Sequence, residues 1–319
     1  MSDVSLESRV SAVLRAERGV TVTDFEPLLG GHSGLTYRAN TSEGAIVVKA
    51  VPEGQRPVGR HDMLRQASIL EALASTDVPV PGIVAVDRQE PAWFAMDLIA
   101  GESLEPVLDD PAVDPAVASA RMLRAAEVLP LLHAVEPSSI DGAADPLTPA
   151  DELDRWAKTL AAVPPELVAG GSELLGLLRA DVPDAIAPTL VHGDYRLGNI
   201  LSQGTEPAAL IDWEIWSAGD PRVELGWFLV FADGSNFPGV GREIPSLPSS
   251  EELIAAYTGG ARTLPDMTWF DALGRLKMAS IMGHNLRRHR EGRHIDPDQE
   301  KLPATIARLI DTGTSLLRH

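Results

Sequence analysis

The sequence predicts an α+β protein, with strands gathered in the first third of the chain and helices in the rest. Three observations lead to this class. Short apolar runs of strand length, separated by glycine-rich or polar turns, fill residues 25–51 and 83–99. After Gly101 the composition shifts to Ala, Leu and Pro, and amphipathic helical patterns follow. Two more short apolar runs, 189–191 and 208–211, enclose a polar loop.

Composition narrows the class of protein further. A length of 319 residues favours two domains or one domain of two lobes, and a hydrophobic content of 44% allows a sizeable core. The absence of cysteine excludes disulfides and thiolate chemistry. The first residues do not read as a signal peptide and no apolar run approaches the roughly 20 residues of a membrane span, so we expect a cytoplasmic protein with no membrane partner.

The net charge of −19 argues against nucleic acid as a partner, because phosphate backbones attract basic proteins. The charge is compatible with a cationic small substrate. A solvated acidic surface is the stronger explanation of this charge, so the charge does not identify a substrate. The oligomeric state stays open.

The N-terminal segments read as a helix over 4–18, followed by strands over 25–29, 35–39 and 45–51. A glycine-rich turn, GGHSG, joins the first two strands. The backbone N–H groups of such a turn can cradle phosphate oxygens, although hairpins also use glycine. Lys49 interrupts the apolar run of the third strand, and a buried lysine is costly unless it meets an anion.

A helix over 61–74 and strands over 83–87 and 93–99 come next. Beyond Gly101 we expect helices, with a turn at Ser217–Pro221 between two of their groups. The predicted helical stretches are 115–135, 151–160, 173–180, 251–257, 269–288 and 303–317.

The stretch from Leu190 to Trp213 carries the strongest chemical signal. It reads HGDYRLGN, then an apolar run, then IDW. We expect a strand, a polar loop and a second strand that ends in Asp212. This arrangement would bring the side chains of Asp194, Asn199 and Asp212 together at one end of the strands. Their hard oxygens suit a magnesium–phosphate centre. The other interpretation is a plain turn built from glycine, Asp and Asn.

These motifs resemble the aminoglycoside phosphotransferase family and its relatives, the choline and homoserine kinases. The resemblance rests on HGDxxxxN with IDW after it, on the lysine strand IVVKA after GGHSG, and on the VPVP segment that ends the 61–74 helix. It implies a bilobal protein-kinase-like fold. We expect a small N-lobe with a mixed, antiparallel sheet (1–97), a hinge (98–101) and a larger, mainly helical C-lobe (102–319).

The resemblance also implies an activity: ATP- or GTP-dependent transfer of a phosphoryl group to a hydroxyl of a small molecule. Asp194 is then the general base, and Arg196 reaches the transferring phosphate. Asn199 and Asp212 hold Mg²⁺, and Lys49 fixes the nucleotide phosphates. The nucleotide-binding residues implied are Gly30, Gly31, Ser33, Gly34, Lys49, Gln66, Met96, Asp97 and Ile99.

The chain departs from the family at two positions. Gln66 stands where kinase-like enzymes place a glutamate that pairs with the strand lysine, and Glu224 stands where the family has Asp. Either Gln66 suffices, or Glu71 is the partner, or the pair is absent. We expect Glu224 to hold the turn. A nucleotide-binding pseudokinase is the alternative function. Aminoglycosides, macrolides, choline-like amines, sugars and homoserine remain open as acceptors.

Overall fold

The computed structural model of the chain describes residues 5–28, 35–52, 54–109, 112–260 and 264–318. Its contacts divide the chain into two compact units. The first takes Met1–Gly101, Ser138–Ala143 and Ala208–Ile215, and the second takes Glu102–Pro137, Ala144–Pro207 and Trp216–His319. Asp212 therefore belongs to the first unit and Asp194 to the second. The predicted lobe boundaries stay a prediction.

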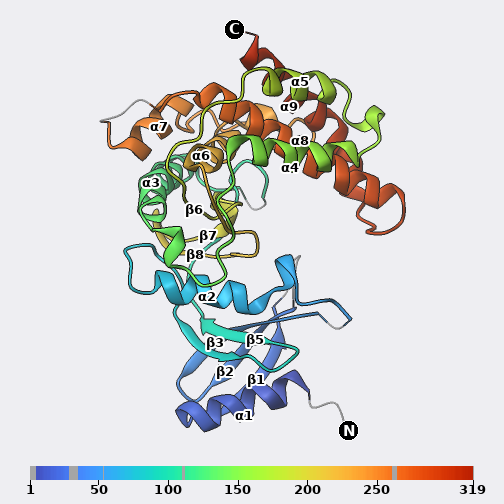
Figure 1. Cartoon of the computed structure of the whole chain (residues 1–319). Coiled ribbons are helices and arrows are strands. Elements are labelled where there is room, and N and C mark those ends of the chain that lie inside the picture. Colours follow the sequence, from blue (N-terminus) through green and yellow to red (C-terminus); the bar gives the residue numbers. More distant parts are fainter. Residues whose placement is uncertain (1–4, 29–34, 53, 110–111, 261–263, 319) are drawn as a thin grey trace. The chain divides into compact units, whose positions relative to one another are not determined.

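An antiparallel sheet forms the body of the first unit (Figure 1). Its strands lie in the order β1-β2-β3-β5-β4. They are β1 (Val22–Pro27), β2 (Leu35–Thr41), β3 (Gly44–Ala50), β4 (Ile83–Asp87) and β5 (Trp93–Asp97). Helix α1 (Leu6–Arg18) places Val10 and Leu14 in a core with Val48 and Trp93 of the sheet. Burial of this apolar surface, at about 25 cal/mol per Å², stabilises the unit.

Helix α2 (Met63–Leu73) contacts β4 and β5 of the same sheet. It begins at Asp62, whose carboxylate accepts the N–H of Arg65 as an N-cap. Ile69 and Leu73 are fully buried, which fixes the face that the helix turns to the strands. The same helix carries Gln66, a polar side chain that is only 2% exposed.

Helices dominate the second unit, together with short two-stranded pairs (Figure 1). The strands are β6 (Thr189–Val191) with β9 (Ser217–Gly219), and β7 (Ile200–Gln203) with β8 (Glu206–Leu210), which belongs to the first unit from Ala208 onward. The helices are α3 (Pro115–His133), α4 (Pro149–Ala161), α5 (Gly171–Ala180), α6 (Pro221–Leu229), α7 (Ser250–Thr258), α8 (Met267–Arg290) and α9 (Leu302–Leu317). The buried α8 packs against α4, α6 and α9, so it acts as the axis of this unit.

Two glycines set the distance between α6 and α8. A Cβ on Gly226 would overlap the carbonyl oxygen of Phe270, and a Cβ on Gly274 would lie 2.7 Å from the carbonyl oxygen of Gly226. Both contacts are with backbone, which cannot move aside cheaply. Only glycine permits this approach. It brings the side chains of α6 and α8 together beside the loop that follows β6.

The α+β class predicted from the sequence is confirmed. Two details were wrong. Ile200–Gln203, predicted as loop, forms β7, because Gly204, with φ of 62°, turns the chain back into β8. Ser217–Gly219, predicted as turn, pairs with β6, because backbone hydrogen bonding needs no large side chains. No helix in the described ranges has the length and apolar character to cross a membrane.

Candidate active site

The loop after β6 is shaped by a glycine and a buried histidine. Gly193 has φ of 90°, a left-handed conformation that favours glycine. His192 is fully buried, and its Nδ1 accepts the backbone N–H of Asp194 at 3.2 Å. A short 3₁₀ turn, Leu197–Asn199, then brings Asn199 back toward the start of the loop. The HGDxxxxN spacing therefore brings the Asn199 amide into hydrogen-bond contact with the Asp194 carboxylate.

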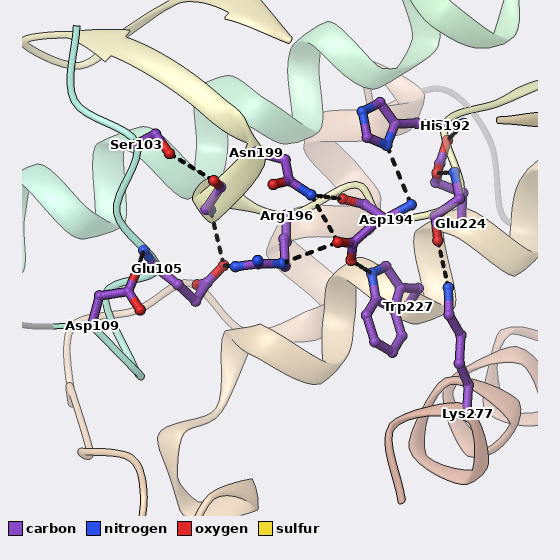
Figure 2. Close-up of polar contacts among 12 residues, drawn as sticks. Ser103, Glu105, Asp109, His192, Asp194, Arg196, Asn199, Glu224, Trp227 and Lys277 are labelled. Atoms are coloured by element: carbon purple, nitrogen blue, oxygen red, sulfur yellow. Dashed lines mark hydrogen bonds and ion pairs between the residues drawn. The ribbon is translucent and has the colours of Figure 1, made fainter. Parts of the chain in front are cut away.

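Three different side chains hold the Asp194 carboxylate (Figure 2). Asn199 Nδ2 donates to Oδ2 at 2.8 Å and also to the Asp194 carbonyl at 2.8 Å. Trp227 Nε1, on α6, donates to Oδ1 at 3.1 Å. Arg196 Nε lies 3.5 Å from Oδ2. The carboxylate is thus oriented on both oxygens, and its side chain is still 29% exposed. A base needs this combination of fixed direction and access.

Arg196 lies between two acidic side chains, Asp194 and Glu105. Besides Asp194, its guanidinium approaches Glu105, with Nη1 3.9 Å from Oε2. The guanidinium crosses Gly198 so closely that a Cβ there would overlap Nη1. The predicted role of Arg196 at a transferring phosphate stays a prediction. What the structure brings together is Arg196 with Asp194.

Glu105 is a buried acid that sequence reasoning missed. Its side chain is fully buried, and Oε2 accepts the N–H of Gly198 at 3.3 Å. Oε1 has no hydrogen-bond partner among the residues that the structure describes. Burial raises the pKa of Glu105 to about 8, although the Arg196 charge opposes the rise. The only signal in the sequence was a single acid inside the run Leu104–Leu108.

Glu224, on α6, hydrogen-bonds the backbone at the start of the loop that follows β6. Its Oε2 accepts the N–H of His192 at 2.9 Å, and its Oε1 accepts the N–H of Gly193 at 2.7 Å. His133 Nε2 lies 3.4 Å from the same carboxylate. Burial raises the pKa of Glu224, but the His133 and His192 contacts outweigh it and leave the pKa lowered. Glu224 is therefore a buried anion that fixes two amides at the start of the loop.

In the first unit, Lys49 of β3 pairs with Asp212. Lys49 Nζ lies 3.2 Å from Oδ1, and the two side chains are 12% and 35% exposed. Asp212 has φ of 68°, which is unusual for a residue other than glycine and marks a constrained site. A small pocket beside this pair is lined by Lys49, Asp212, Gln66 and Met96, together with Leu70, Pro81, Phe94, Leu210, Ile211 and Trp213.

Gln66 does not hydrogen-bond to Lys49 in this structure. Its Nε2 donates to the carbonyl of Arg60 at 2.7 Å, and its Oε1 has no hydrogen-bond partner among the described residues. The Lys49 ammonium pairs with Asp212, as given above. Gln66 still lines the pocket, so its predicted part in nucleotide binding stays a prediction.

Only some of the remaining predicted nucleotide-binding residues lie in the part of the chain that the structure describes. The N–H of Asp97 donates to the carbonyl of Gly82 at 2.9 Å, so the backbone donor at that position is already used. Ile99 follows β5 and is half-buried. Four of the predicted residues lie outside the described part of the chain: Gly30, Gly31, Ser33 and Gly34.

A family comparison extends over both the Lys49 strand and the Asp194 loop. The sequence model of the phosphotransferase enzyme family matches residues 24–266. This chain belongs to that family. The resemblance inferred from HGDxxxxN and IDW is thereby confirmed.

Solved structures of this family share the fold. A protein from Ralstonia eutropha JMP134, provisionally assigned as an aminoglycoside phosphotransferase, has a TM-score of 0.80 at 22% identity over 97% of each chain. An aminoglycoside phosphotransferase in ternary complex with AMP-PNP and hygromycin B has a TM-score of 0.64 at 17% identity, over 97% of this chain and 98% of the other. The kinase-like fold predicted from the sequence is confirmed.

Among curated proteins, the chain is similar to acyl-CoA dehydrogenase family member 11 from Pongo abelii. The two are 26% identical over an alignment of 323 positions, which covers 95% of this chain and 41% of that protein. The chain thus spans about two fifths of the length of this relative. More than half of the relative lies outside the match, so its name carries no activity over to this chain.

Proposed function

We propose that this phosphotransferase-family protein transfers the γ-phosphoryl group of ATP or GTP to a hydroxyl of a small molecule. The observation that carries the proposal is the Asp194 carboxylate, held by Asn199, Trp227 and Arg196 and still 29% exposed. A carboxylate that is oriented by donors and open to solvent is suited to accept a hydroxyl proton. It stands in the HGDxxxxN loop of a kinase-like fold.

Phosphoryl transfer needs alignment and neutralised charge more than covalent help. In our proposal Asp194 orients the acceptor hydroxyl and takes its proton as the bond to phosphorus forms. Arg196 keeps Oδ2 of Asp194 in place, and its cationic charge also favours the anionic phosphoryl group in that neighbourhood. Glu105 holds the other end of the same guanidinium.

The nucleotide is assigned to the first unit. Lys49 is a largely buried cation that pairs with Asp212 and lines the small pocket beside it. The family relative solved with AMP-PNP supports a nucleoside triphosphate as the donor.

Magnesium fits the donor set on chemical grounds. The Asp212 carboxylate is 35% exposed, and the Asn199 amide donates through Nδ2 while its oxygen is a hard ligand. No three His, Asp or Glu side chains gather around a metal position in the described ranges. Mg²⁺ in phosphoryl-transfer sites is held by one or two carboxylates together with substrate phosphates, so a sparse protein set is consistent with it. Bound there, it would neutralise the charge of the phosphates.

Transfer of the labelled γ-phosphoryl group to candidate acceptors tests the proposal and identifies the acceptor class. The protein is incubated with γ-labelled ATP or GTP, Mg²⁺ and panels of aminoglycosides, macrolides, choline-like amines, sugars and homoserine. The proposal expects label in an alkali-stable phosphate ester with one class, and no such product with the Asp194→Asn variant. Equal product with that variant would remove Asp194 from the mechanism.

A weakly active nucleotide-binding protein is the second candidate, and Gln66 favours it. The position that supplies a glutamate in kinase-like enzymes supplies no charge here, and Gln66 Oε1 lacks a partner among the described residues. The two candidates differ in turnover. Nucleotide binding that persists without any labelled ester across all panels would favour the second.

A further inference from the structure

Lys277, in the middle of α8, is a lysine in an unusual place. Its side chain is buried, at 5% exposure, whereas lysine is almost never fully buried unless it is paired. Within the described residues it makes no ion pair shorter than 4 Å. Instead, Nζ donates to the carbonyl oxygen of Gly193 at 2.5 Å. A buried ammonium that donates its hydrogen bond to a backbone carbonyl requires a structural explanation.

Aromatic rings provide the rest of its surroundings. Nζ lies 3.8 Å from the centroid of the Trp227 ring and 5.2 Å from that of Trp156 on α4. Cation–π contacts of this kind stabilise a desolvated ammonium. Burial lowers the pKa of Lys277 to about 8, although the charges of Asp194, Glu152 and Glu224 oppose the change. The ammonium is therefore retained in an environment that disfavours it.

The two groups that Lys277 contacts, the Gly193 carbonyl and the Trp227 indole, are each connected to Asp194. The Gly193 carbonyl belongs to the peptide bond that joins Gly193 to Asp194, and the indole under Lys277 donates its N–H to Asp194 Oδ1 (Figure 2). Gly193 has no side chain to fix its orientation. Its N–H is held by the Glu224 carboxylate and its carbonyl by the Lys277 ammonium. Two buried groups of opposite charge thus fix the glycine next to the base.

We propose that Lys277 is a positioning residue for Asp194, fixing both the Gly193–Asp194 peptide and the Trp227 indole that hydrogen-bonds the carboxylate. The kinetic part of this inference rests on the proposed function, because Asp194 is the base only if the chain transfers a phosphoryl group. The structural part does not. The contacts of the Lys277 ammonium are with the Gly193 carbonyl and the Trp227 and Trp156 rings, so in this proposal its effect on catalysis passes through the position of Asp194.

The indole N–H of Trp227 offers a direct readout. The chain has six tryptophans, so protein labelled with ¹⁵N-tryptophan gives six indole signals in a ¹H–¹⁵N spectrum. Trp227→Phe removes and thereby identifies one of them. Asp194→Asn shifts that signal, because the hydrogen-bond acceptor changes from a carboxylate to an amide. These two variants calibrate the measurement without any turnover.

Lys277→Met, which keeps the length and removes the charge, is the test. We expect it to shift the Trp227 signal and to lower kcat about 10- to 100-fold, with KM for the nucleotide changed less than about threefold, because a misplaced base costs chemistry more than binding. Lys277→Arg, which restores the cation, should recover part of both. Ser280→Ala is the matched control: it also changes α8, but among the described residues the Ser280 hydroxyl bonds only the Leu276 carbonyl, and the variant should change neither.

An unchanged Trp227 signal in Lys277→Met, or an equal shift in Ser280→Ala, would overturn the inference. If Lys277→Met does not fold, Lys277→Leu takes its place, because it also removes both the charge and the donor to Gly193; the same outcomes decide. If the wild type shows no transfer to any acceptor, the proposed function fails. The indole signal still reports whether Lys277 positions Asp194.

Discussion

Two aspartates, Asp194 of the second unit and Asp212 of the first, are held in opposite ways. Asp194 receives side-chain donors on both carboxylate oxygens, and a buried lysine and a buried glutamate fix its loop. Among the residues that the structure describes, Asp212 has one side-chain partner, Lys49, at 3.2 Å. Asp194 is therefore oriented by the fold of the second unit, whereas the direction of Asp212 depends on one ammonium and a left-handed backbone.

The difference corresponds to the two tasks that we propose. A base works only in a narrow range of geometry, so many fixed contacts are useful around Asp194. A residue that binds phosphates through a cation gains from having few fixed partners, because the ligand then completes its surroundings. Substitutions near Asp194 should affect turnover or folding. Substitutions near Asp212 should affect binding.

The largest effect is expected from Asp194 itself. Asp194→Asn keeps the shape of the side chain and removes the base, so kcat should fall about 10³-fold, within the range that general base catalysis contributes. Nucleotide binding should persist, since Lys49 and Asp212 are untouched. Steady-state transfer to the acceptor found in the labelling panels measures the first, and isothermal titration measures the second. A variant that loses binding but keeps kcat would reverse the roles assigned to the two aspartates.

The next effect concerns the support under the loop. Glu224→Gln places an NH₂ group against the N–H of His192 or Gly193, so a buried donor loses its acceptor. The free energy of unfolding should fall by about 2–4 kcal/mol. Chemical denaturation measures it. Glu127→Gln, which alters a half-exposed ion pair with Arg124, is the control and should leave the midpoint unchanged. Equal behaviour of the two would contradict the support role.

Glu105 should make the free energy of unfolding depend on pH. Its pKa is raised to about 8 from an ordinary 4.5, so its contribution to stability is complete below pH 4.5 and is lost as the pH rises through 8. Glu105→Gln is uncharged throughout and should escape that loss. Relative to the wild type, the variant should gain about 1–3 kcal/mol of unfolding free energy between about pH 5 and pH 8.5. Denaturation at several pH values tests this, and a difference that does not change with pH would contradict it.

The smallest effect is expected at Gln66. Gln66→Glu brings the missing charge to α2, near the pocket that Lys49 lines. If the ammonium then divides its contacts between the introduced carboxylate and Asp212, nucleotide affinity should change by only a few-fold, as one partly exposed pair does. Titration with ATP and GTP measures the change, and Gln66→Met serves as the uncharged control. A change above about 100-fold would show that Gln66 had been limiting, which favours the weakly active alternative.

Sequence reasoning found the parts of the site that are close in the chain. HGDxxxxN places Asp194, Arg196 and Asn199 within one loop. The apolar run around Lys49 indicated a lysine that is costly to bury without an anion. It missed Glu105, Trp227 and Lys277, because these residues come from a loop before α3, from α6 and from α8. Each looks ordinary in its own segment. Only tertiary contacts, such as the glycine-mediated approach of α6 to α8, give them a role.

The most direct test of the central claim is magnesium-dependent nucleotide binding by the wild type and by Asp212→Asn. Thermal unfolding is followed with ATP and with GTP, each with and without Mg²⁺. A ligand at about 100 times its dissociation constant stabilises the folded state by about 2.7 kcal/mol. We predict such a shift with one of the nucleotides only when Mg²⁺ is present, and its loss in Asp212→Asn. No shift with either nucleotide, or a shift that needs neither Mg²⁺ nor Asp212, would contradict a phosphotransferase centre at this site.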